Sequence, residues 1–314
     1  MQSALAALMM HGYRHDTNRP GFEPHGAVDT VGCTAEDLGV VACHLLLPLR
    51  YRYRDRHSRR TGMAGSMDLD TIRSAFEARE FFLVYQPIVS LRDEACFGAE
   101  ALIRWRRQNT VLDASKFIPW TDRTTLSGPI TYWVVDTVAV ELNDWLGRHE
   151  AIHISINVPP EIFGRGGLEY AATKSGLLAR TKQLIAEVTE RGIPDQLGLE
   201  GLNNVPTTGA RIALDDTTLS GANLALLTRC NFDFIKLDQR LVAELALDNP
   251  PAPWVDGLAA LLETTDLQVI AEGVETAFQA DALRAAGVQL AQGHYFSTPL
   301  SARDFKRYCD PTSR

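Results

Sequence analysis

Acidic and amide side chains occur at or near the ends of successive short apolar segments along this sequence. They are Glu100, Asn157, Glu187, Asp215, Asp216, Glu272 and Gln292, and a single lysine, Lys236, falls among them. An ionised carboxylate in an apolar run is unfavourable unless it is paired or bound to a metal ion. Sites with oxygen ligands only favour hard divalent cations such as Mg²⁺ or Mn²⁺. Because the carboxylates exceed the needs of one ion, the series predicts two ions, which suit in-line displacement at phosphorus.

Each carboxylate taken alone also has a structural explanation. Arg104 lies four residues after Glu100, so a local salt bridge between these two residues is the alternative explanation for Glu100. The adjacent Asp215 and Asp216 end the apolar stretch "RIALDD". Neighbouring side chains on a straight strand point to opposite faces. Two adjacent aspartates can therefore serve one site only where their strand breaks into a loop.

The apolar segments that carry these residues predict β-strands that alternate with helices. The strand candidates are 81–89, 97–105, 153–158, 184–190, 211–216, 232–238, 268–275 and 290–296. Helical spacing of apolar residues occurs at 68–80, 129–146, 253–266 and 276–287, where Gly287 marks a helix end. Alternation of this kind indicates a mostly parallel α/β sheet covered by helices.

Eight strands over about 240 residues fit a (β/α)₈ barrel, whose active sites lie at the C-terminal ends of its strands. The short connection between the first two strands predicts a hairpin-like turn. An open doubly wound sheet is the alternative architecture. That fold usually carries a glycine-rich phosphate loop after its first strand, and "YQPIVSLRDE" contains none.

The bulk composition is that of an ordinary globular protein, with 314 residues, 45% hydrophobic and 22% charged. A net charge of −8 argues against a nucleic acid polymer as partner, although not against a nucleotide. The cysteines are Cys33, Cys43, Cys96, Cys230 and Cys309. Their scatter predicts reduced thiols in a cytoplasmic protein rather than a disulfide framework or a zinc site. The apolar run 39–49 is too short for a transmembrane segment, and none is expected.

The chain changes character near residue 66. We expect residues 1–66, which are punctuated by glycine and proline, to form an irregular, disordered segment, and 67–314 to form the barrel domain. The run "RYRYRDRHSRR" at 50–60 has three explanations: a basic patch for anionic lipid or nucleic acid, a solvated linker, or an upstream extension from a misassigned start codon.

An ordered series of motifs resembles the EAL-domain family of cyclic di-GMP phosphodiesterases. The series is "YQPIVSL", "GAEALIRW", "FIPW", "SINV", "EVTE", "ALDD", "FIKLD", "VIAEGVET" and "QGHYFSTPL", from about Asp68 to about Asp310. The resemblance implies a modified (β/α)₈ TIM barrel with one antiparallel strand. It also implies hydrolysis of cyclic di-GMP, a bacterial second messenger, to linear pGpG with two Mg²⁺ or Mn²⁺ ions. A homodimer is usual for the family.

By motif match, the resemblance assigns a role to each candidate residue. It implies that Glu100, Asn157, Glu187, Asp215 and Asp216 bind the metal ions, with Asp215 between both ions. Lys236 would position or deprotonate the attacking water, Glu272 would act near the metals, and Gln292 would hold the water network. The positions that contact substrate in the family are Gln86, Leu102, Arg104 and Pro299. Glu190 matches a glutamate that steadies the loop after the fifth strand.

The sequence departs from the family directly after Asp216. The family usually continues as "FGTGYSSL", whereas residues 217–224 read "TTLSGANL", and "VPP" follows Asn157 in place of an apolar-Ser-small pattern. A threonine at positive φ would cost about 1 kcal/mol or more, so the loop must take another path. In the family this loop couples dimerisation to metal occupancy. Two hypotheses follow: a phosphodiesterase of full or reduced activity, or a non-catalytic cyclic di-GMP receptor that signals through a protein partner.

Overall fold

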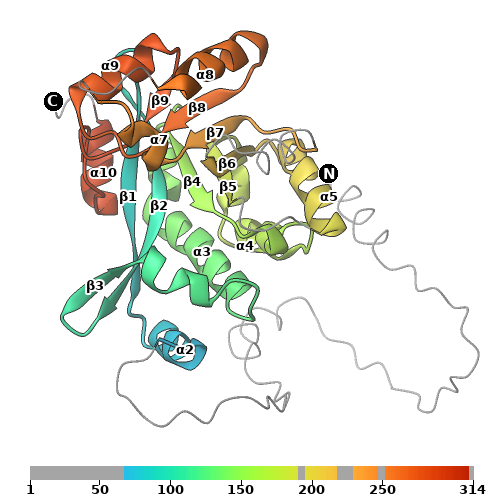
Figure 1. Ribbon diagram of the computed structural model, residues 1–314. Helices are drawn as coiled ribbons and strands as arrows, with labels where there is room; N and C mark the ends of the chain where they lie inside the picture. The colour runs from blue at the N-terminus through green and yellow to red at the C-terminus, as the bar shows by residue number, and fades with distance from the viewer. Residues whose placement is uncertain (1–66, 190–194, 218–228, 247–251, 311–314) are drawn as a thin grey trace, which may run out of the picture. The chain divides into compact units, whose positions relative to one another are not determined.

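The computed structural model describes residues 67–189, 195–217, 229–246 and 252–310. Nine strands form one sheet (Figure 1). They are β1 (Phe81–Ser90), β2 (Cys96–Arg107), β3 (Thr110–Asp113), β4 (His153–Asn157), β5 (Leu184–Thr189), β6 (Arg211–Thr217), β7 (Phe234–Leu237), β8 (Gln268–Ala271) and β9 (Leu290–Ala291). All eight predicted strands are present, and the last two end earlier than predicted.

The sheet closes into a barrel of eight strands. The hydrogen-bonded order is β1-β9-β8-β7-β6-β5-β4-β2-β3, and the additional pairing of β1 with β2 completes the ring. β1 runs antiparallel to both of its neighbours, whereas β2 and β4 to β9 pair in parallel. The prediction of a modified (β/α)₈ barrel with one antiparallel strand is therefore confirmed, and the doubly wound alternative is excluded.

β3 is an addition to the barrel that the sequence pattern did not predict. It pairs antiparallel with the outer end of β2, from Arg104 opposite Asp113 to Arg107 opposite Thr110. Figure 1 shows this hairpin as an arm that extends beyond the other strands. Its four residues are mostly exposed, so they lack the buried alternation that identifies a strand in a sequence.

Helices lie around the barrel, with α2 (Leu69–Glu77) near the start of β1 (Figure 1). The other described helices are α3 (Ser127–Leu146), α4 (Gly167–Lys174), α5 (Gln196–Asn204), α7 (Gln239–Ala243), α8 (Pro253–Thr264), α9 (Ala277–Ala285) and α10 (Ala302–Cys309). Short 3₁₀ segments occur at Ala114–Lys116, Ile118–Trp120, Pro160–Ile162, Leu177–Gln183 and Val205–Thr208. The four predicted helices are all confirmed. At α9, a capping box formed by Thr276 and Gln279 begins the helix, and Gly287 follows its end at φ 83°.

An apolar layer fills the barrel below the ends of the strands. It consists of Ile88, Ile185, Ala213, Phe234, Ile270 and Leu290. Because side chains alternate along a strand, the residue two positions further on faces the same interior. Those next residues on β5 to β9 are Glu187, Asp215, Lys236, Glu272 and Gln292. The strand period therefore places every one of these polar side chains one layer above an apolar plug.

A disulfide between Cys96 and Cys309 corrects the expectation of reduced thiols. These cysteines are 213 residues apart in sequence, and their Cα atoms lie 5.3 Å apart. Their spacing carries no signal, because only the return of α10 along β1 and β2 brings the end of α10 to the beginning of β2. Cys230 is a buried free cysteine, and Cys33 and Cys43 lie outside the described residues.

In the part of the chain that the structure describes, we find no helix whose length and apolar character would let it cross a membrane.

Candidate active site at the mouth of the barrel

Lys236 lies at the centre of the polar layer and is almost completely buried. Its Nζ atom is surrounded by four carboxylates that lie on, or directly after, four different strands. The nearest oxygens are those of Glu100 at 3.1 Å, Glu187 at 2.8 Å, Asp215 at 3.1 Å and Glu272 at 2.7 Å. Since all four reach one nitrogen atom, the barrel brings the predicted acidic residues together at one point.

Two amides complete this layer. Asn157 donates a hydrogen bond from Nδ2 to Glu100 Oε1 at 2.8 Å. Gln292 donates from Nε2 to Glu100 Oε2 at 2.8 Å and to Glu272 Oε1 at 3.0 Å. Glu100 is therefore bound to Asn157, Lys236 and Gln292. The alternative of a salt bridge to Arg104 is wrong, because Arg104 pairs with Asp113 instead.

The strand that carries the two adjacent aspartates breaks where the sequence analysis expected. β6 shifts its register against β7 between Leu214 and Thr217, and Asp216 has φ 52°. A positive φ costs a non-glycine residue roughly 1–2 kcal/mol, although aspartate tolerates it better than most. The irregularity lets Asp215 and Asp216 share one site, because a carboxylate oxygen of each lies within 4.8 Å of the other and of an oxygen of Glu272.

Carboxylates outnumber the positive charges in this layer, since four of them surround Lys236 and Asp216 lies close to two of those four. Burial, together with the charge of Glu100, raises the pKa of Glu187 well above its usual range. Burial also raises the pKa of Asp215, and that of Glu272 to about 8. Burial opposes the ionisation of Glu100, but Lys236 and the two amides outweigh it and lower the pKa.

Burial and neighbouring carboxylates act on the pKa of Lys236 in the directions opposite to those in which they act on the pKa of a carboxyl group. Burial alone would lower its pKa, but the surrounding carboxylates outweigh burial and raise the pKa well above its ordinary value. The surrounding carboxylates therefore favour the positively charged form of the lysine.

The donor atoms of this layer fit divalent cations. Among the described residues, Glu187 Oε1 and Gln292 Oε1 are buried and accept no hydrogen bond. An unsatisfied buried oxygen costs roughly 1–3 kcal/mol, and more when it is charged. A cation next to these atoms, or next to the group formed by Asp215, Asp216 and Glu272, would satisfy them and offset the excess negative charge.

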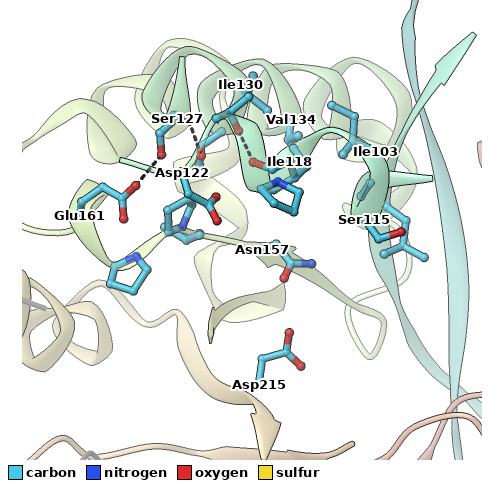
Figure 2. Close-up of a pocket in the computed structure, with 18 of the residues that line it drawn as sticks. Ile103, Ser115, Ile118, Asp122, Ser127, Ile130, Val134, Asn157, Glu161 and Asp215 are labelled. Carbon is cyan, nitrogen blue, oxygen red and sulfur yellow. Dashed lines mark hydrogen bonds between the residues drawn. The ribbon is translucent and has the colours of Figure 1, made fainter. Parts of the chain in front are cut away.

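A cavity of about 300 Å³ opens beside the acidic layer. Figure 2 shows Asn157 and Asp215 at one end of it and the segment from Ser115 to Val134 along its wall. The wall is mainly apolar, with Leu102, Ile118, Pro119, Ile130, Val134 and Val158 among its residues. Sequence reasoning used "FIPW" only as a family marker and so missed this wall. The apolar residues of the cavity wall follow no single spacing in the sequence, because they come from elements of different kinds.

One carboxylate outside the acidic layer stabilises this wall. Glu161, in the 3₁₀ segment after β4, accepts hydrogen bonds at 2.9 Å from the Arg123 backbone N–H and from the Ser127 hydroxyl. Ser127 is the first residue of α3. Glu161 therefore joins the turn before α3 to the strand that ends at Asn157.

The remaining candidate residues lie around the mouth. Gln86 donates from Nε2 to the Ser297 carbonyl at 2.6 Å, so it holds the segment that leads to Pro299. Leu102 lines the cavity. The side chain of Arg104 is 14% exposed. Glu190 and the divergent residues 218–224 lie outside the described residues, so their predicted roles stay predictions.

The protein is thus a closed (β/α)₈-type barrel with one antiparallel strand. The oxygen donors at its acidic mouth are suited to divalent ions. The sequence model of the EAL domain matches residues 69–299. This match covers most of the chain, and the chain belongs to the EAL domain family. The resemblance inferred from the motifs is confirmed.

Individual relatives agree with this assignment. The chain is 29% identical over 277 residues to the probable cyclic di-GMP phosphodiesterase PdeB of Escherichia coli K12, covering 87% of this chain and 51% of the relative. It is 32% identical over 241 residues to MucR of Pseudomonas aeruginosa, a bifunctional diguanylate cyclase/cyclic di-GMP phosphodiesterase, covering 74% and 35%. The chain thus spans about a third to a half of the curated relatives it matches.

Solved structures show the same fold. The PaMucR phosphodiesterase in complex with c-di-GMP superposes with a TM-score of 0.68 at 31% identity, covering 76% of this chain and 98% of that one. The EAL enzyme Bd1971 in its cAMP-bound form has a TM-score of 0.69 at 28% identity, covering 77% and 69%.

Proposed function

We propose that this chain is a metal-dependent phosphodiesterase that hydrolyses one phosphodiester bond of cyclic di-GMP to give linear pGpG. The observation that carries the proposal is the convergence of four strand-end carboxylates on Lys236 Nζ, beside the Asp215–Asp216 pair. The substrate is suggested by relatives that are named cyclic di-GMP phosphodiesterases and by the PaMucR complex with c-di-GMP.

We assign the metal ligands to the residues that the barrel brings together. Glu100, Asn157, Glu187, Asp215 and Asp216 would hold two Mg²⁺ or Mn²⁺ ions, and Glu272 lies close enough to Asp215 and Asp216 to contribute. Two such ions supply the positive charge that in-line displacement at phosphorus requires. Support for this set comes from its oxygen-only chemistry and from the unsatisfied Glu187 Oε1.

Lys236 acts by its charge. We assign it this role because the surrounding carboxylates raise its pKa, which favours the charged ammonium over a base that would deprotonate water. It can donate hydrogen bonds to the attacking water and stabilise negative charge that develops on the phosphate oxygens. Glu272 and Gln292, which are hydrogen-bonded to each other, complete the set of groups that orient this water.

The substrate would lie across the mouth. The apolar cavity beside Asp215 has the size and lining for one guanine base, because flat aromatic rings favour apolar walls. A base in this cavity places the adjoining phosphate near the acidic layer. Arg104, Gln86, Leu102 and Pro299 are assigned to contacts with the rest of the dinucleotide, and Glu190 to support of the loop after β6.

The experiment is a product assay on the purified chain. Cyclic di-GMP with Mg²⁺ or Mn²⁺ should give pGpG, and Glu100→Ala or Lys236→Ala should abolish product while nucleotide binding is measured in parallel. A wild-type chain that forms no linear product over hours, with ions and nucleotide present, would exclude the enzyme.

A second candidate is a receptor that binds cyclic di-GMP without hydrolysing it and signals through a protein partner. The observation that favours it is the sequence "TTLSGANL" in place of the usual glycine-rich loop after Asp216. It predicts tight binding in Ca²⁺, measured by calorimetry, and negligible turnover in Mg²⁺ or Mn²⁺. Absence of binding in Ca²⁺ would count against it.

We also propose a cytoplasmic homodimer whose barrel domain is 67–314, with residues 1–66 as a separate N-terminal segment. The dimer and the location rest on the family alone. Sedimentation of the purified chain tests the oligomeric state, and a monomer at micromolar concentration would contradict the dimer.

A further inference from the structure

Arg104 occupies a defined place above the acidic layer. Side chains two residues apart on a strand share a face, so Glu100, Leu102 and Arg104 follow one another along the inner face of β2. Glu100 belongs to the acidic layer, and Leu102 lines the cavity beside it. Because each pair of residues advances a strand by about 7 Å, Arg104 lies at the outer edge of the mouth.

Asp113 fixes the direction of this arginine. β3 pairs antiparallel with β2, and its register sets Asp113 directly opposite Arg104. Arg104 Nε lies 2.9 Å from Asp113 Oδ1 in a salt bridge, and Arg104 Nη1 donates a hydrogen bond to its neighbour's carbonyl, Ile103 O, at 3.0 Å. The arginine side chain is 14% exposed, whereas that of Asp113 is 68% exposed.

These two contacts restrict the guanidinium group. A guanidinium carries five N–H donors in a rigid fork; the hydrogen bond to Ile103 uses one on Nη1, and the salt bridge lies on the Nε side. In the described part of the chain, no hydrogen bond from Arg104 Nη2 is found. The Nη2 donors are therefore the ones that can bind a phosphate oxygen.

Asp113 is the N-cap residue of the 3₁₀ segment Ala114–Lys116, but its side chain makes no capping hydrogen bond. An exposed ion pair adds little to stability, and β3 lies outside the ring of eight barrel strands. Without Asp113, the long arginine side chain would sample several rotamers, and binding of an anion would have to order it. With Asp113, that ordering is already present in the free protein.

We propose that Asp113 is a positioning residue, which holds Arg104 in the orientation that contacts a phosphate of the bound dinucleotide. This inference rests on the proposed function, because it assigns a task within the same mouth. A positioning role differs from one in which Asp113 only neutralises the charge of Arg104. A carboxylate that competed with the phosphate for Arg104 would weaken binding, and its removal would strengthen binding.

The test compares Asp113→Ala with Asp113→Asn in the full chain. Binding of cyclic di-GMP is titrated calorimetrically in Ca²⁺, and KM and kcat are measured in Mg²⁺. Asp113→Ala should raise Kd and KM about tenfold and leave kcat within about twofold, since orientation is lost but the acidic layer is intact. The amide oxygen of Asp113→Asn can still accept from Nε, so this variant should stay within about threefold of the wild type.

Two controls separate positioning from a structural effect. Asp93→Ala removes another exposed aspartate that pairs with an arginine, Arg92, in the turn at the opposite end of β2, and should change neither constant. In the Arg104→Ala background, Asp113→Ala should have no further effect on Kd, because the two residues act as one unit.

Several results would overturn the inference. These are an unchanged or smaller Kd for Asp113→Ala, an Asp113→Asn variant as impaired as Asp113→Ala, or a full Asp113→Ala effect without Arg104. If the wild type binds the nucleotide and the variants match it, only the role of Asp113 fails. If the wild type neither binds nor hydrolyses the nucleotide, the proposed function fails and this inference with it.

Discussion

At the scale of single residues, the site depends on the balance of charge around Lys236. Four carboxylates contact one ammonium group, and Asp216 adds a fifth negative charge nearby. Buried charges are tolerated only when each has a partner, so Lys236 holds together side chains that would otherwise repel one another. Divalent cations would have the same effect from the open side of the layer.

Replacement of Lys236 tests this balance. Lys236→Met keeps the volume of the side chain but leaves the carboxylates without their shared partner. We expect the free energy of unfolding to fall by about 3–5 kcal/mol in EDTA, the usual cost of breaking a buried pair, and Mg²⁺ to restore part of it. Activity should fall about a hundredfold or more, because a preorganised positive charge is lost.

Urea denaturation with and without Mg²⁺ measures the change, and Lys116→Met on an exposed 3₁₀ turn is the matched control. A Lys236→Met variant as stable as the wild type in EDTA would show that the lysine does not stabilise the carboxylates.

The raised pKa of Glu272 predicts how stability depends on pH when divalent ions are removed. Burial raises this pKa from 4.5 to about 8 in the folded protein. Between these values the folded protein keeps a proton that the unfolded chain has lost. The free energy of unfolding should therefore fall as the pH rises from about 4.5 to about 8.

Denaturation in EDTA at several pH values checks this, and Glu272→Gln should flatten the dependence. Stability that increases with pH across this window would contradict the expected excess of negative charge.

At this scale the sequence predicted much of the site. Strand-end carboxylates are costly in apolar runs, so their recurrence was itself informative, and the barrel brings Glu100, Asn157, Glu187 and Asp215 together. The partner of Arg104 could not be predicted, because Asp113 reaches it through a hairpin with no sequence periodicity. The cavity wall was missed for a related reason: Ser127 and Glu161 meet only after α3 and β4 have packed.

At the scale of elements, two features position the site without contributing to it directly. The alternation of side chains along β5 to β9 sets each polar residue two positions beyond an apolar residue of the barrel interior. The strands were predicted from their short apolar runs rather than from this alternation. The contact between α10 and β2 could not be predicted from the sequence, because a contact between residues 213 positions apart leaves no local pattern.

The disulfide predicts a measurable dependence on redox conditions. Cys96–Cys309 ties α10 to the beginning of β2, and Phe305 of α10 stacks on Tyr85 of β1. A cross-link over a long loop contributes about 2–4 kcal/mol by restricting the unfolded chain. Oxidised protein should therefore unfold at a higher temperature than reduced protein or Cys309→Ser.

Cys230→Ser, which removes the buried free cysteine, serves as the control that should not abolish the difference between oxidised and reduced protein. Equal melting temperatures of the oxidised and reduced wild type would argue that the two cysteines stay unpaired in solution.

At the scale of the whole molecule, closure of the barrel unites residues from both ends of the described chain. β1 pairs with β2 on one side and with β9 on the other, so Gln86 lies next to Ser297 although they are 211 residues apart. Every site residue that the structure describes lies between residues 86 and 299. The site is thus contained within the segment proposed as the barrel domain.

Removal of the first part of the chain tests that proposal. A variant that begins at Met63 should hydrolyse cyclic di-GMP with kcat and KM within about threefold of the full chain, because domains carry their own core. Circular dichroism confirms its folding. A truncated chain that folds but has lost turnover would show that residues 1–62 contribute to the site.

The most direct test of the account is turnover as a function of metal concentration. The purified chain, freed of divalent ions, is titrated with Mn²⁺ in the presence of cyclic di-GMP, and pGpG is quantified by chromatography. We predict no product in EDTA, a saturable rise as Mn²⁺ is added, and loss of that rise in Glu187→Gln. Product that forms equally in EDTA, or none at saturating Mn²⁺ and nucleotide, would contradict the claim that the converging carboxylates hold catalytic ions.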